Sequence, residues 1–145
     1  MKKLLIALVA LFAILPMAAR DRVTSDVNAL PARAQNTLSK YFGKTKVNHI
    51  KIESHTFGGD DYDVILDNGT EIDFDSKGDW KEIDCGHREV PSGLILPAIS
   101  NYVAKNFKGQ KIVSLDKDGR KYDVQLSSGI ELEFDRSGAF RRVDD

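Results

Sequence analysis

An internal match at a spacing of 60 residues constrains the fold of this 145-residue chain more than any other feature. When residues 62–84 are aligned with residues 122–144, 10 of the 23 pairs are identical and most of the others are conservative. A match of this kind indicates that one structural unit is built twice. We therefore expect a first repeat over residues 30–84, a polar linker over 85–94 and a second repeat over 95–145.

Each repeat opens with a pattern typical of one helix. Leu-Pro stands at 30–31 and again at 96–97, and proline suits the first helical turn because its missing N–H would have no partner there. Apolar residues then recur every three or four positions, at 34, 38 and 41/42 and at 99, 102/103 and 107. Gly43 and Gly109 follow, where helices commonly end.

The spacing then changes to strict alternation, which predicts strands. Tyr62, Val64 and Leu66 alternate with acidic residues, and Gly69 ends a turn-forming triplet. Each repeat is therefore expected to be a helix packed on one face of a four-stranded antiparallel meander, giving an α+β protein of tandem α-β4 units. The predicted strands cover 46–54, 61–67, 70–75 and 79–84, then 111–116, 121–127, 130–135 and 139–144.

The first 19 residues predict export. Two lysines precede an unbroken apolar run over residues 4–15, and small residues follow it, as in a secretory signal peptide. A membrane-anchored, uncleaved N-terminus is the alternative. Residues 20–29 are polar and are expected to form a flexible N-terminal segment. We expect a periplasmic or secreted protein of a Gram-negative bacterium, with no membrane span after processing.

Composition excludes other classes of protein. The net charge is −1, and no cluster of basic residues offers the positive stripe that nucleic acids need. The single cysteine, Cys85, cannot form an internal disulfide, although a dimer linked through Cys85 is open. Cys85 and His87 form neither a complete catalytic set nor a complete zinc site. The acidic turn at residues 114–125 lacks the terminal ligands of a calcium loop. We predict no enzyme activity, no metal and no cofactor.

The order of motifs resembles a known family. Leu-Pro opens a helix, Tyr-Asp-Val and Gly-x-Glu-[Ile/Leu]-x-Phe-Asp follow, and Gly-x-[Trp/Phe] closes each unit. This pattern resembles the PepSY-like domain family of small exported bacterial proteins, which is described as similar to the β-lactamase inhibitor protein. The resemblance covers nearly all of residues 20–145. It implies a fold similar to that of the inhibitor protein and a non-enzymatic protein, an inhibitor or a binding module, with no catalytic residues to carry over.

The sheet face opposite the helices is the candidate binding surface. Alternation places acidic residues there, and Trp80 and Phe140 lie out of phase with Ile83 and Val143. Each aromatic side chain therefore lies on the open face or at its rim, or a β-bulge turns it toward the core. The candidate partner-binding residues are Asp63, Glu71, Asp73, Trp80, Lys81, Asp123, Glu131, Glu133, Phe140 and Arg141.

Two roles are compatible with such a face. The first is an exported binding protein, inhibitor-like, that docks a protein or peptide of the cell envelope through the open faces of its sheets. The alternative is a periplasmic protein that binds a small ligand or a cation. An ordinary solvated face with cross-strand ion pairs is the simplest interpretation of the same residues.

Overall fold

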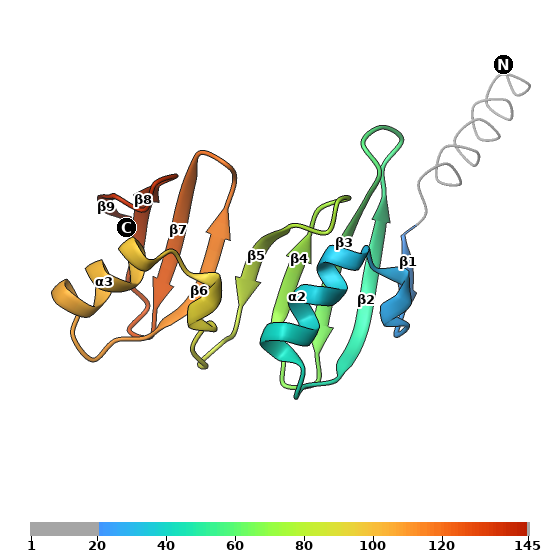
Figure 1. The fold of residues 1–145 in the computed structure, drawn as a ribbon, viewed down its shortest axis with the longest axis horizontal. Coiled ribbons are helices and arrows are strands. Elements are labelled where there is room, and N and C mark those ends of the chain that lie inside the picture. The colour runs from blue at the N-terminus through green and yellow to red at the C-terminus, as the bar shows by residue number, and fades with distance from the viewer. Residues whose placement is uncertain (1–20, 145) are drawn as a thin grey trace, which may run out of the picture.

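The computed structural model describes residues 21–144, so the predicted signal peptide lies outside the described residues. These residues form one sheet and two α-helices (Figure 1). The elements are β1 (Arg22–Thr24), α2 (Ala32–Phe42), β2 (Val47–Ser54), β3 (Asp60–Leu66), β4 (Glu71–Phe74), β5 (Trp80–Asp84), α3 (Pro97–Asn106), β6 (Ile112–Lys117), β7 (Lys121–Leu126), β8 (Glu131–Asp135) and β9 (Phe140–Asp144).

All nine strands belong to a single antiparallel sheet in which each strand pairs with its neighbours in sequence. The expectation of tandem α-β4 units, each with its own meander, is therefore wrong. Strand β5 pairs with β6, with Ile83 opposite Leu115, so the sheet continues across the middle of the chain. Two separate sheets would leave a row of backbone N–H and C=O groups unpaired on each of these strands, and the pairing satisfies both rows.

Both helices lie on the same face of the sheet (Figure 1). Leu38 of α2 and Val103 of α3 belong to one continuous hydrophobic core with the strand residues that point toward them. Phe74 and Phe134, which alternation predicts to face the helices, are both completely buried. The predicted inward phase of these strands is confirmed, and each such side chain contributes about 1.5–3 kcal/mol by its burial.

The segments expected to be flexible or to link repeats also take part in the fold. Residues 22–24 form β1, which pairs with β2 and places Val23 opposite Lys51. A 3-10 turn follows, and the Asp26 carboxylate caps it by accepting from the Asn28 N–H at 2.9 Å. The linker over 85–94 contains a second 3-10 turn, and Val90 within it is completely buried.

Candidate functional site

The sheet face that points away from α2 and α3 carries one straight row of acidic side chains. Along this open face the strand register places one carboxyl group on each of six consecutive strands, directly opposite the next. We call these residues the acidic row; they are Asp63, Asp73, Glu82, Asp116, Asp123 and Glu133. Lys51 lies opposite Asp63 at one end and Arg142 opposite Glu133 at the other. Neighbouring strands are about 4.8 Å apart, so like charges here repel across each pair.

The repulsion is strongest in the middle of the row, over β4, β5 and β6. Partial burial, the charges of Asp63 and Glu82 and a hydrogen bond with Asp63 raise the pKa of Asp73 to about 7. Burial and neighbouring carboxylates also raise the pKa values of Glu82 and Asp116. Among the described residues, none of these three carboxyl groups has a cationic group within 4.0 Å. The centre of the row is therefore acidic, and residues 21–144 supply it with no counter-ion.

A shallow hollow lies beside this centre. Its volume is about 240 Å³, and it opens on the sheet face over β5, β6, β7 and β8. Five carboxyl groups line it, together with Ser114, Val124 and Gln125. The carboxyl groups belong to Glu82, Asp84, Asp116, Asp123 and Glu131. In the part of the chain that the structure describes, no basic residue lines this acidic hollow. Its chemistry suits a cationic group presented by a partner.

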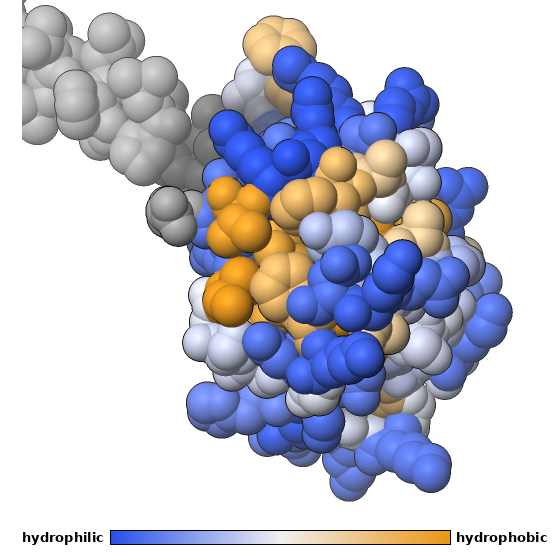
Figure 2. Space-filling model, turned by 90° about the vertical axis from the view of Figure 1, so that its left-hand side faces the viewer, coloured by the Kyte–Doolittle hydropathy of each residue, from blue (hydrophilic) through white to orange (hydrophobic). Residues whose placement is uncertain are grey.

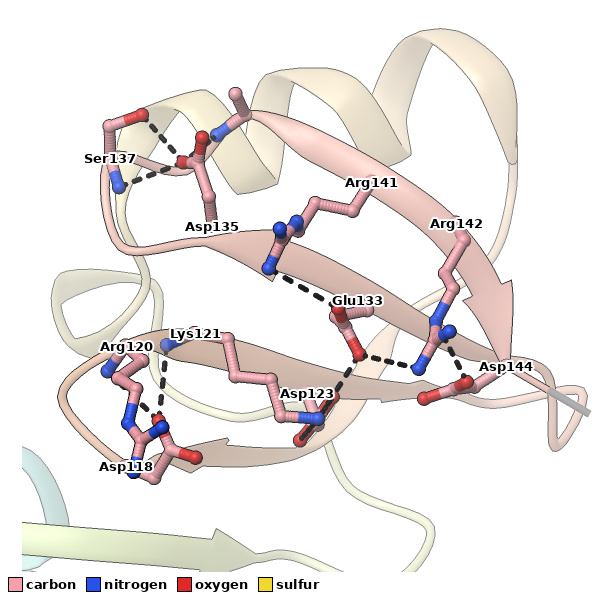
Figure 3. A network of polar contacts seen from close by, with 11 residues as sticks. Asp118, Arg120, Lys121, Asp123, Glu133, Asp135, Ser137, Arg141, Arg142 and Asp144 are labelled. Carbon is pink, nitrogen blue, oxygen red and sulfur yellow. Dashed lines mark hydrogen bonds and ion pairs between the residues drawn. The ribbon is translucent and has the colours of Figure 1, made fainter.

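The β8 end of the row is neutralised, in contrast to its centre (Figure 3). Glu133 is 5% exposed and is surrounded by cations: Lys121 Nζ at 3.1 Å, Arg142 at 3.2 Å and Arg141 at 3.6 Å. The hydrogen bond from Lys121, with the charge of Arg142, lowers the pKa of Glu133. Lys121 also contacts the Asp123 carboxylate at 3.2 Å. This end of the row is a satisfied ion-pair network.

One group of carboxylates in this network has the spacing of metal ligands. Oxygen atoms of Asp123, Glu133 and Asp144 lie within 4.8 Å of one another. However, Lys121 already contacts the first two, and Arg142 contacts the last two. A metal ion would have to displace both cations, so this group does not fit a metal site.

The structure places eight of the ten predicted face residues on the open face. These are the carboxylates of β3, β4, β7 and β8 with the two basic residues of β5 and β9. Lys81 reaches Asp61 at 3.1 Å and Arg141 reaches Glu133 at 3.6 Å. Asp63 lies opposite Asp73, and Asp123 lies opposite Glu133. Glu71 and Glu131 each stand two residues earlier on β4 and β8 and are exposed.

Trp80 and Phe140 do not lie on the open face, because a bulge in each strand turns them toward the helices. Trp80 pairs with Phe74 and Phe140 pairs with Phe134, with Lys81 and Arg141 as the extra residues. Each aromatic side chain packs against the core. Lys117 Nζ lies 3.9 Å from the centre of the Trp80 ring, and Phe140 stacks on Tyr102 at 4.4 Å. These two residues are therefore removed from the candidate surface.

Sequence reasoning missed three acidic residues at the centre of the face: Glu82, Asp84 and Asp116. The bulge at Lys81 shifts the phase of β5, so alternation counted from Trp80 gives the wrong face for that strand. Alternation counted from Ile83 would have placed Glu82 and Asp84 on the open face, because Ile83 is completely buried and these two residues stand on either side of it. Asp116 similarly follows the buried Leu115.

Cys85 lies in the wall of a different hollow, near the C-terminal end of α2. That hollow has a volume of about 590 Å³, and Lys40, Lys44 and Arg88 are among its lining residues. Cys85 is 4% exposed, and burial raises the pKa of its thiol despite a hydrogen bond with Thr70. His87 is exposed at the following turn. A buried thiol with a raised pKa is a poor nucleophile and a poor partner for disulfide exchange between copies.

Comparisons with known proteins agree with this fold. The family described as "Putative beta-lactamase-inhibitor-like, PepSY-like" matches residues 60–142. No curated protein matches the chain. None of the helices among residues 21–144 has the length and apolar character needed to cross a membrane.

Three solved structures resemble the chain closely. A "putative periplasmic protein of unknown function" from Bacteroides vulgatus is 44% identical, with a TM-score of 0.82, covering 87% of this chain and 100% of that one. A "putative calcium-regulated periplasmic protein" from Bacteroides thetaiotaomicron is 35% identical, with a TM-score of 0.80, covering 86% and 97%. A second "putative periplasmic protein" from Bacteroides vulgatus is 36% identical, with a TM-score of 0.80, covering 86% and 97%. The predicted periplasmic or secreted location is confirmed.

Proposed function

Because the chain belongs to the PepSY-like, beta-lactamase-inhibitor-like family, we propose that it is a periplasmic, non-enzymatic binding protein whose open sheet face docks a cationic protein or peptide. The observation that carries this proposal is the acidic centre of the open face. Three opposed carboxyl groups, on Asp73, Glu82 and Asp116, have no counter-ion among residues 21–144 and lie on the sheet face opposite α2 and α3 (Figure 1).

The energetics of the row support a role in binding. Directly opposed like charges destabilise a sheet, so the central carboxylates oppose folding at neutral pH. Lysine or arginine side chains of a partner would remove this repulsion on docking. Complementary charge of this kind accelerates encounter and selects the partner more than it strengthens the final complex. The partner is therefore expected to be basic and its association strongly dependent on salt.

Three observations support a non-enzymatic role. Among the described residues, the one thiol is buried and its pKa is raised, so nucleophilic catalysis at Cys85 is disfavoured. The matching family is described as inhibitor-like. The open face presents carboxyl groups to solvent in a row rather than in an enclosed pocket, which suits docking of an extended surface.

Titration calorimetry with two peptides tests the proposal. A lysine-rich peptide should bind and a glutamate-rich peptide of the same length should not, with binding of the first weakening as salt is added. Glu82→Gln combined with Asp116→Asn should weaken binding of the lysine-rich peptide severalfold. The matched control combines Asp60→Asn with Glu89→Gln, which removes two charges away from the acidic row and should leave binding unchanged. Equal binding to all three proteins would overturn the proposal.

A calcium-binding role is the second candidate. Its support is the acidic hollow, whose five carboxyl groups supply the hard oxygen ligands that calcium prefers, and the description of one 35% identical relative as calcium-regulated. None of the lining groups is basic, which suits a cation, but among the described residues no three of these carboxyl groups have oxygen atoms within 4.8 Å of one another, so calcium would have to draw them together. Thermal unfolding in calcium and in chelator separates the candidates. Docking of a protein alone predicts an unchanged midpoint, whereas a calcium site predicts a rise that Glu82→Gln and Asp84→Asn reduce.

A further inference from the structure

Strand β9 presents an edge that has no partner among the described residues. Its register on β8 matches that of β5 on β4: Val143 opposes Leu132 as Ile83 opposes Ile72. In β5 the outer edge is covered, because Ile83 also pairs with Leu115 of β6. Strand β9 therefore has the same arrangement as β5, a strand that pairs with another strand along its outer edge.

Two side chains at this edge are apolar and at least partly exposed, whereas the side chains at the matching positions of the first half of the sheet are buried. Val143 is 49% exposed, whereas Ile83 at the matching position of β5 is completely buried. Ile130 is partly exposed, whereas the matching turn residue, Thr70, is polar and 2% exposed. A hollow of about 440 Å³ lies between Val143 and the turn that contains Ile130. Figure 2 shows apolar side chains gathered on this end of the molecule.

We propose that this edge binds a second copy of the same chain, with β9 pairing antiparallel to β9 across a two-fold axis at Val143. In that register Arg142 of each copy lies opposite Asp144 of the other, so both cross-strand pairs join opposite charges. The two Val143 side chains meet on the helix side. The segment Arg142–Asp144 is therefore complementary to itself, as an isologous interface requires.

The backbone is oriented for this pairing. In β5 the Cys85 N–H donates to the Val113 carbonyl of β6 at 2.9 Å, and alternation gives Ile83 the same outward direction. The matching position of β9 is Val143, so its N–H and C=O point away from β8 and can bond their counterparts in the second copy. The dimer would carry one continuous sheet, with all four helices on one face.

The same edge is protected against other strands. A bulge at Arg141, an exposed charge at Arg142 and a half-buried charge at Asp144 are features that natural edge strands use to prevent pairing. A strand with the reverse charge order matches both charges, and β9 itself is such a strand. Within one copy Arg142 already contacts Asp144 at 3.3 Å, and in the dimer each of the two residues would also face its opposite charge in the second copy. Arg142 also contacts Glu133, but a guanidinium has five N–H donors and can serve both carboxylates.

Sedimentation velocity over a range of protein concentrations tests the dimer. Val143→Asp should raise the dissociation constant by about tenfold or more, since it puts two carboxylates on the axis. Val23→Asp is the matched control: Val23 is also an exposed valine on an edge strand, at the opposite end of the sheet, and its replacement should change nothing. A natural protein that stays monomeric at millimolar concentration, or a dimer equally sensitive to both changes, would overturn the proposal.

A charge-reversal pair identifies the register. Arg142→Asp alone and Asp144→Arg alone each oppose like charges across the axis, so each variant should be monomeric. An equimolar mixture of the two variants restores both pairs and should form a heterodimer. Circular dichroism establishes whether each variant is folded. Arg142→Asp also brings a second carboxylate opposite Glu133; if this variant does not fold, the oligomeric states of Asp144→Arg and Val143→Asp test the dimer instead. Variants that dimerise alone as well as in the mixture would exclude this register.

Discussion

Asp63 and Asp73 lie directly opposite each other on β3 and β4, and their side chains share a hydrogen bond. Two carboxyl groups can share a hydrogen bond only when one of them holds a proton. Partial burial, the charges of Asp63 and Glu82 and this hydrogen bond together raise the pKa of Asp73 to about 7. The open face therefore changes charge near neutral pH.

Asp73→Asn should stabilise the protein at high pH. A carboxyl group whose pKa is raised in the folded state from 3.8 to about 7 favours folding only while protonated, and that contribution is lost as pH rises through this interval. Because Asp73 is only half-buried, solvent reduces the effect to about 1 kcal/mol at pH 8. Urea unfolding at pH 4 and pH 8 measures it. The two proteins should be equally stable at pH 4, and a less stable variant at pH 8 would contradict the assignment.

Glu133→Gln should have the opposite effect. Its pKa is lowered by Lys121 and Arg142, so its carboxylate favours folding above its unfolded pKa, and the contribution is lost as pH falls through the folded value. The variant should be less stable than the natural protein at pH 7 and equally stable near pH 2. The same urea series measures both effects. Stability differences of the same sign for Asp73→Asn and Glu133→Gln would contradict the division of the row into a neutralised end and an unpaired centre.

Phe74→Ala should cost about 3–5 kcal/mol, since the side chain is completely buried and the cavity cannot fully collapse. Phe57→Ala is the matched control, because Phe57 is 91% exposed between β2 and β3 and should contribute little. Thermal unfolding of both variants is sufficient. A comparable loss in the two variants would contradict the inward phase of β4.

Gly78→Ala should destabilise the protein more than Gly58→Ala. Both glycines have positive φ, 87° and 101°, so both replacements strain the backbone, by about 1–2 kcal/mol. At Gly78 a Cβ atom would also lie 2.9 Å from the Ala34 amide nitrogen at the start of α2, whereas at Gly58 it meets open space. Urea unfolding measures the difference. Equal losses would show that the turn before β5 is not packed against α2.

Alternation and turn residues predicted most strands and their inward side chains, because these signals are local. The pairing of β5 with β6 was not predictable in the same way, since Ile83 and Leu115 are separated by a helix and nothing between them encodes their register. Strand β1 was missed because Arg22–Thr24 is short and largely polar, and pairing with β2 supplies its order. On the candidate face, the bulges at Lys81 and Arg141 reverse the predicted phase of β5 and β9. Asp116 of β6 was missed as well, although it directly follows the buried Leu115.

The order of the strands in the sheet is the order of the strands in the chain. Each strand that leaves an export channel can therefore pair with the one before it, and no later segment must insert between strands already paired. Most pairings close short loops, and only β1–β2 and β5–β6 wait for a helix to form between them. Such a topology of mainly sequence-local pairings keeps the entropy of loop closure low and favours rapid folding. We expect this chain to fold progressively from its N-terminal side as it enters the periplasm, growing the sheet one strand at a time.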